Sequence, residues 1–130
     1  MATVYVMVVV NVSQAVASGN LGAYVYMADT TGFSGSGQGG NELITTVTDG
    51  STIIWSVVPI DPATSVSIVN FTGQAIPGLI KPVEYAQYND TVWGGQVLSL
   101  GTHVQYSMTL LLNGADQLTF DPFITSNPPQ

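Results

Sequence analysis

The sequence predicts an all-β fold, an antiparallel β-sandwich of roughly seven to nine short strands in a single domain. Short β-branched runs recur along the 130 residues, and turn signals such as Asp49-Gly50 and Asn113-Gly114 separate them. No ten-residue window shows the 3.6-residue periodicity of a capped helix. We expect the sandwich to span residues 1–124 and a flexible tail to occupy residues 125–130.

The first expected strand, residues 3–12, reads TVYVMVVVNV and is apolar at every position from Val4 to Val10. Such a run is typical of a central strand covered on both faces, by a second sheet on one side and by a partner subunit on the other. Residues 13–18 fit a single helical turn. The remaining strands are expected at 22–29, 42–48, 52–58, 65–72, 93–100, 104–112 and 118–120.

Two dipeptides predict hairpins, because Asp, Asn and Gly accept the positive φ of type I′ turns. Asp49-Gly50 would join strands 42–48 and 52–58, and Asn113-Gly114 would join strands 104–112 and 118–120. Residues 73–90, with two prolines, predict a long connection that holds one short edge strand. The alternation in 104–112 places Val104, Tyr106, Met108 and Leu110 on one face.

The charge composition excludes several classes of function. Lys81 is the only strong cation, there is no Arg or Cys, and eight carboxylates give a formal net charge of −7. Nucleic acid and anionic membranes are therefore poor partners, since both need clustered Lys or Arg. A surface poor in Lys and Glu loses little side-chain entropy on contact, which favours self-association, most simply as a homodimer. Met1-Ala2-Thr3 lacks a signal-peptide start, so we expect a cytoplasmic protein.

Catalytic and metal sites find little support. Gly35, Gly37 and Gly40 match G-x-G-x-x-G, but no helix is expected to follow, so we interpret the segment as a loop. His103 is the only histidine, too few for a zinc site or a catalytic set, and is expected on the surface. The acidic residues are expected to bond backbone N–H groups at turns, with a calcium site assembled from separated loops as the alternative. We therefore expect that the protein has no enzymatic activity and binds no cofactor.

One candidate binding site lies at Asn89, Asp90 and Trp93. An aromatic face beside amide and carboxylate groups suits the C–H face and the hydroxyl groups of a sugar. The alternative is that Trp93 begins a strand and fills the end of the sandwich. Trp55, within the apolar run IIWSVV, is expected in the core.

Ordered segments along nearly the whole chain resemble the PixA/AidA inclusion-body protein family of bacteria. They are Ser18-Gly19-Asn20-Leu21, Val25-Tyr26, Asn41-Glu42-Leu43, Asp49-Gly50, Ile54-Trp55-Ser56-Val57, Pro59, Asp61-Pro62, Val66-Ser67-Ile68, Phe71-Thr72-Gly73, Trp93-Gly94-Gly95 and Phe120-Asp121-Pro122-Phe123. Asn11 departs from the family pattern, which has Asp after the first strand.

The resemblance implies a small cytoplasmic protein that accumulates, in some bacteria as inclusion bodies, often under quorum-sensing control or in host-associated species. It carries over no catalytic residue. The expected function is therefore non-enzymatic self-association, as a homodimer or larger assembly. The alternative is a soluble lectin that binds neutral carbohydrate, with or without calcium.

Overall fold

The computed structural model describes residues 2–31, 39–40 and 43–129. The described strands are β1 (Thr3–Val10), β2 (Val25–Asp29), β3 (Ile44–Thr48), β4 (Thr52–Pro59), β5 (Val66–Thr72), β6 (Val83–Glu84), β7 (Val92–Gln96), β8 (Gly101–Gln105), β9 (Ser107–Leu112), β10 (Asp116–Phe120) and β11 (Phe123–Asn127). The helical elements are α1 (Val12–Ser18) and the 3-10 turns η1 (Gly22–Tyr24) and η2 (Ala86–Tyr88). The motif at Gly35, Gly37 and Gly40 lies mostly outside the described residues.

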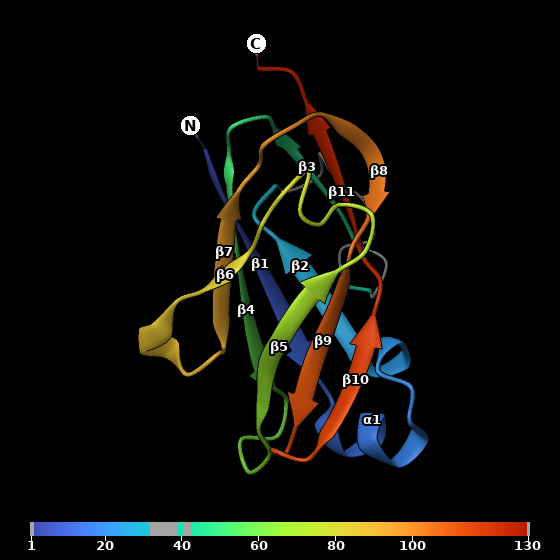
Figure 1. Cartoon of the computed structure of the whole chain (residues 1–130). Helices are drawn as coiled ribbons and strands as arrows, with labels where there is room; N and C mark the ends of the chain where they lie inside the picture. The colour runs from blue at the N-terminus through green and yellow to red at the C-terminus, as the bar shows by residue number, and fades with distance from the viewer. Residues whose placement is uncertain (1, 32–38, 41–42, 130) are drawn as a thin grey trace.

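Three sheets build the sandwich (Figure 1). A five-stranded sheet has the order β2-β1-β4-β7-β6, and two three-stranded sheets have the orders β10-β9-β5 and β3-β11-β8. The prediction of an all-β, single-domain fold is confirmed. The sheets are mixed, however, because β1 pairs in parallel with β4 and β11 pairs in parallel with β3. Parallel neighbours arise because the chain crosses between sheets instead of turning back beside itself.

β1 has one buried face and one exposed face: the chain covers one side of the strand as predicted, and cover of the other side by a partner subunit stays a prediction. Val4, Val6, Val8 and Val10 are at most 8% exposed and face the core. On the opposite face Tyr5 is 54% exposed, and Met7 is 51% exposed. Continuous apolar character therefore did not mean that this chain buries both faces.

The two predicted turns have different outcomes. Asn113-Gly114 does join an antiparallel hairpin, β9–β10, with φ of 54° and 68° at the two residues. Asp49-Gly50 makes a turn but not a hairpin, because β3 belongs to the β3-β11-β8 sheet and β4 to the five-stranded sheet. The turn is instead hydrogen-bonded to two distant segments, the end of β11 and the residue after β7. Asp49 N donates to Asn127 O at 2.8 Å, and Gly50 N donates to Val97 O at 3.1 Å.

The expected strand 104–112 is divided at Tyr106, where the chain leaves β8 in one sheet and enters β9 in another. Tyr106 N donates to Pro122 O at 3.0 Å, so it bonds to neither ladder. Its side chain is fully buried, as are Met108 and Leu110. The predicted inward face is therefore correct although the strand is broken.

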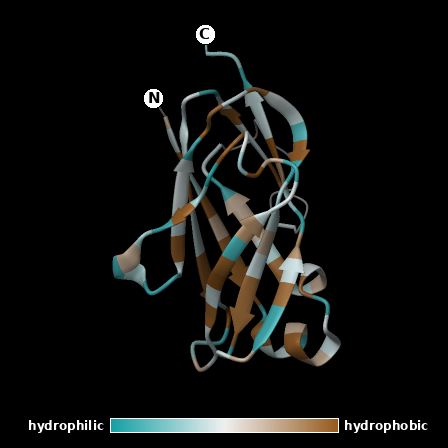
Figure 2. Cartoon of the chain, viewed as in Figure 1, coloured by the Kyte–Doolittle hydropathy of each residue, from teal (hydrophilic) through white to brown (hydrophobic). Residues whose placement is uncertain are grey.

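An aromatic cluster lies at the centre of the core. Trp55 Nε1 donates to Tyr106 Oη at 3.0 Å, and both side chains are 0% exposed. Phe71 packs against Trp55 with ring centroids 4.6 Å apart. Hydrophobic colouring concentrates on the strands and on α1 (Figure 2).

Two segments have more regular secondary structure than the sequence predicted, one after β1 and one near the C-terminus. The helical segment α1 is seven residues long, and Asn11 caps it by accepting a hydrogen bond from Gln14 N at 3.4 Å. Residues 125–127, expected in a flexible tail, belong to β11, which pairs with β3 on one side and β8 on the other. A strand paired on both edges holds this segment in the fold.

Candidate functional site

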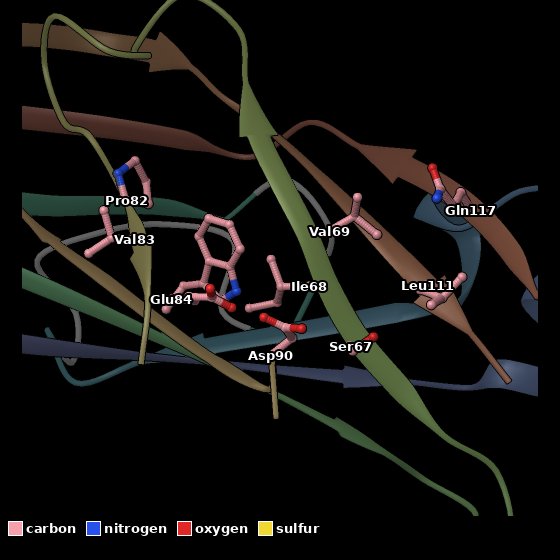
Figure 3. A pocket seen from close by; sticks show the side chains of 10 residues that line it. Ser67, Ile68, Val69, Pro82, Val83, Glu84, Asp90, Leu111 and Gln117 are labelled. Carbon is pink, nitrogen blue, oxygen red and sulfur yellow. The ribbon is translucent and has the colours of Figure 1, made fainter. Parts of the chain in front are cut away.

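A pocket of about 660 Å³ opens between the edge strand β5 of one sheet and the β6–β7 edge of the five-stranded sheet (Figure 3). It is lined by Ser67, Ile68, Val69, Pro82, Val83, Glu84, Asp90, Trp93, Leu111 and Gln117. Apolar side chains from β5 and β6 form much of the wall, while two carboxyl groups and an amide supply polar atoms. This volume lies within the range of about 300–1,000 Å³ that is typical of small-molecule sites.

Trp93 lies between the core and this pocket. In the β4–β7 register it pairs with Trp55, and its ring packs against Phe71 with centroids 5.6 Å apart. Its indole Nε1 is buried and has no hydrogen-bond partner among the described residues. The indole therefore packs against the core and also lines the pocket, while its Nε1 is buried.

Glu84 and Asp90 form a carboxyl pair at the pocket. Hydrogen bonding to Asp90, and then the negative charge of that neighbour, raise the pKa of Glu84 above its ordinary value. The backbone fixes Asp90 firmly: φ is 62°, and its carbonyl accepts from Ile68 N at 2.7 Å. This bond ties the turn before β7 to the edge of β5 and so closes one side of the pocket.

The structure brings together two of the three residues that the sequence singled out. Asp90 and Trp93 line the pocket, but Asn89 does not; it is exposed, with φ of 52°, at the end of η2. Sequence reasoning missed Glu84, which belongs to the short edge strand β6. The only signal was its place in the long connection 73–90, and this does not show that β6 pairs with β7.

The arrangement offers binding chemistry. The pocket holds hydrogen-bond acceptors on two carboxyl groups, polar groups on Ser67 and Gln117, and an apolar wall. Within the described ranges no three His, Cys, Asp or Glu side chains gather closely enough to hold a metal ion. His103 is exposed on β8, where its ring meets Phe123 edge-on at 4.3 Å.

A second surface of interest is the outer face of the five-stranded sheet. We define the outer sheet face as the outward positions of β1, β2, β4 and β7: Thr3, Tyr5, Met7, Val9, Tyr26, Ala28, Thr52, Ile54, Ser56, Val58, Val92, Gly94 and Gln96. None of these side chains is charged. Large apolar side chains therefore meet solvent on a sheet face that carries no charge.

One edge of the outer sheet face is already covered by the chain. A Cβ at Gly94 would lie 2.5 Å from Tyr85 Oη and 3.1 Å from Ile53 O. Only glycine therefore lets Tyr85 lie over β7 at this point.

No described helix is long and apolar enough to cross a bilayer.

The fold is similar to the crystal structure of the inclusion body protein PixA from Burkholderia cenocepacia J2315, with a TM-score of 0.71 over 98% of this chain and 95% of that chain. At 10% sequence identity the likeness concerns the fold alone. No curated protein matches the chain. A family model described as a domain of unknown function, DUF8788, matches residues 2–118, so the chain belongs to this family.

Proposed function

We propose that the protein is a non-enzymatic, self-associating protein of the PixA/AidA inclusion-body type, which accumulates in dense cytoplasmic assemblies. The observation that carries the proposal is the exposure of large apolar side chains on a surface with little charge. Those exposed are Tyr5, Met7, Val16, Tyr26, Val58, Ile60, Val83, Tyr88, Leu98 and Leu100. The likeness of fold to PixA agrees with this proposal.

The physical basis is a low cost of ordering the surface. Long Lys, Arg and Glu side chains lose up to about 2 kcal/mol of rotamer freedom when a contact immobilises them. This chain has one Lys, no Arg and two Glu, whereas Tyr, Leu and Val are already restricted. Contacts between copies therefore gain apolar burial with little loss of side-chain entropy.

The test is sedimentation velocity of the purified chain over a wide concentration range, at low and high salt. We expect a dimer or larger species at micromolar concentration. Assembly should strengthen with salt, because screening weakens repulsion between copies that each carry a net charge of −7. A monomer at every concentration and salt level would refute the proposal.

A second candidate function is the binding of neutral carbohydrate in the Trp93 pocket. The indole ring beside two carboxyl groups favours it, because the ring can pack against the C–H face of a sugar while the carboxylates accept from its hydroxyl groups. An ammonium group or a metal ion can only meet the carboxylates. The sugar would bind directly, without a bridging calcium ion, and Glu84 would take the place of the Asn89 that the sequence suggested.

A glycan array in calcium and in chelator, followed by titration of the best sugar, tests this candidate. Trp93→Ala removes the ring that packs against the sugar and should weaken binding about tenfold or more. Asn89→Gly, which keeps the positive φ of that residue, is the matched control and should bind normally. Blank arrays in both buffers refute sugar binding, and hits lost in chelator refute the direct mode.

A further inference from the structure

The outer sheet face is continuous across four strands, because the register aligns its residues in rows. One row runs Tyr5, Ile54 and Gly94 across β1, β4 and β7. Another runs Ala28, Met7, Ser56 and Val92 across β2, β1, β4 and β7, and a third runs Tyr26, Val9 and Val58. The face is therefore a single patch and not a scatter of exposed side chains.

Tyr5 stands between two hollows on this face. One, of about 340 Å³, is lined by Tyr5, Ile54, Ser56, Tyr85, Tyr88 and Val92. The other, of about 360 Å³, is lined by Tyr5, Val6, Met7, Ala28, Asp29, Thr30 and Ser56. A projecting tyrosine beside a hollow is self-complementary under two-fold rotation, since each copy can place its ring in the hollow of the other.

Charge also points to a second copy as the occupant. The protein carries a formal net charge of −7, and two copies repel wherever their carboxylates meet. The outer sheet face bears no charged side chain, and the Asp29 carboxylate at its rim accepts a hydrogen bond from Thr45 Oγ1 at 2.8 Å. A charged partner would find no complementary group here, whereas an identical neutral face meets no repulsion.

The size of the patch suits a small dimer interface. Four strands about 4.8 Å apart, two of eight residues and two of five at about 3.3 Å per residue, project roughly 400 Å². The accessible area exceeds the projection because side chains protrude, which brings it near the ~600 Å² per partner at the low end of specific interfaces. Tyr and Met, exposed here, are enriched at such interfaces.

We propose that the outer sheet face is an isologous contact between two copies of this chain, with Tyr5 of each copy inserted into a hollow of the other. This inference rests on the proposed self-association and specifies its surface. It explains why β1 is apolar on both faces: one face packs into the core of its own subunit and the other against the second copy.

Glutamate substitutions measured by sedimentation equilibrium test the contact. Tyr5→Glu and Met7→Glu each place two like charges in the interface, one per copy, and should raise the dimer Kd by about 100-fold or more. The matched control is Leu98→Glu, which makes the same charge change at a side chain of similar exposure, 56% against 54% for Tyr5. It lies outside the outer sheet face and should dimerise like the wild type.

A second measurement uses the absence of cysteine from the chain. Ala28→Cys places a single thiol on the outer sheet face at an exposed, small residue, and Leu98→Cys places one outside it. If copies meet through this face, the rate of thiol labelling in the Ala28→Cys variant should fall severalfold as protein concentration passes the dimer Kd. The rate in the Leu98→Cys variant should not change.

The outcomes separate the two proposals. A wild type that assembles, with both face variants monomeric and Leu98→Glu dimeric, supports the contact. A wild type that assembles while the face variants keep the same Kd and the labelling of Ala28→Cys stays constant overturns the contact and leaves self-association standing. Equal loss of assembly in all three Glu variants also overturns it, because net charge alone would then explain the effect. A strictly monomeric wild type overturns both.

Discussion

Replacing Tyr106 with Phe should destabilise the protein by removing the acceptor of a fully buried hydrogen bond. Trp55 Nε1 donates to Tyr106 Oη at 3.0 Å, and both side chains are 0% exposed. Phe retains the ring contacts with Trp55 and Phe71, at 5.6 and 6.1 Å, so the change isolates the hydroxyl. A buried donor left without a partner costs about 1–3 kcal/mol. We expect the free energy of unfolding at pH 7 to fall by that amount.

The difference in free energy of unfolding between the wild type and Tyr106→Phe should shrink at high pH. Burial raises the pKa of Tyr106 above its ordinary value of 10.0, although the hydrogen bond from Trp55 acts in the opposite direction. With the folded-state pKa raised, the contribution is fully present below pH 10 and is lost as pH rises and the unfolded chain ionises first. The slope is about 1.4 kcal/mol per pH unit. The variant lacks this titration.

The assay is urea unfolding at fixed protein concentration, followed by tryptophan fluorescence at pH 7 and pH 11. Tyr24→Phe is the control, since Tyr24 packs partly buried against the same core. It should stay within about 0.5 kcal/mol of the wild type. The reasoning fails if Tyr106→Phe matches the wild type at pH 7, or if the gap between them is the same at pH 11.

Three further sets of substitutions test the packing and the helix cap. Ser126→Ala should leave the free energy of unfolding unchanged or raise it by up to about 1 kcal/mol, because the buried Ser126 hydroxyl has no partner among the described residues; a clear fall in the urea midpoint would contradict this. Gly73→Ala should cost about 2 kcal/mol or more, since φ is +100° and a Cβ would lie 3.0 Å from the Tyr106 Cα. Gly19→Ala, with φ +69° and no atom within 4 Å of the added Cβ, should cost about 1 kcal/mol. Equal losses at the two glycines would mean that the close contact with the Tyr106 Cα adds nothing to the cost at Gly73. Asn11→Ala should lower stability by about 1 kcal/mol through loss of the α1 cap, seen as a lower Tm, and an unchanged Tm would mean that the cap contributes nothing.

Local pattern predicted most of the strands correctly. β-branched runs became β1, β4 and β5, the two-residue edge strand β6 lies within the expected connection, and Asn113-Gly114 makes the expected hairpin. Each of these depends on residues that are close in sequence. Asp49-Gly50 was misleading because a turn dipeptide specifies the local backbone, and not whether the flanking strands pair with each other.

The candidate pocket was predictable only in part. Asp90 and Trp93 are three residues apart, so a local motif could suggest both. Glu84 joins them because η2 and the turn at Asn89 and Asp90 bring β6 back beside β7. Asn89 and Asp90 both have a left-handed backbone in that turn, but Asp90 lines the pocket while Asn89 is exposed outside it.

Composition and periodicity alone determine that this chain is an all-β domain with an apolar core and almost no cationic surface. These properties depend on residue type and on neighbours along the chain. The tertiary structure alone decides that β1 lies parallel to β4, that Tyr106 carries the chain from one sheet to another, and that one face of β1 remains exposed. The physical reason is that strand pairing and burial depend on contacts between residues far apart in sequence, such as Tyr5 with Ile54. A local sequence pattern does not specify which distant strand pairs with a given strand.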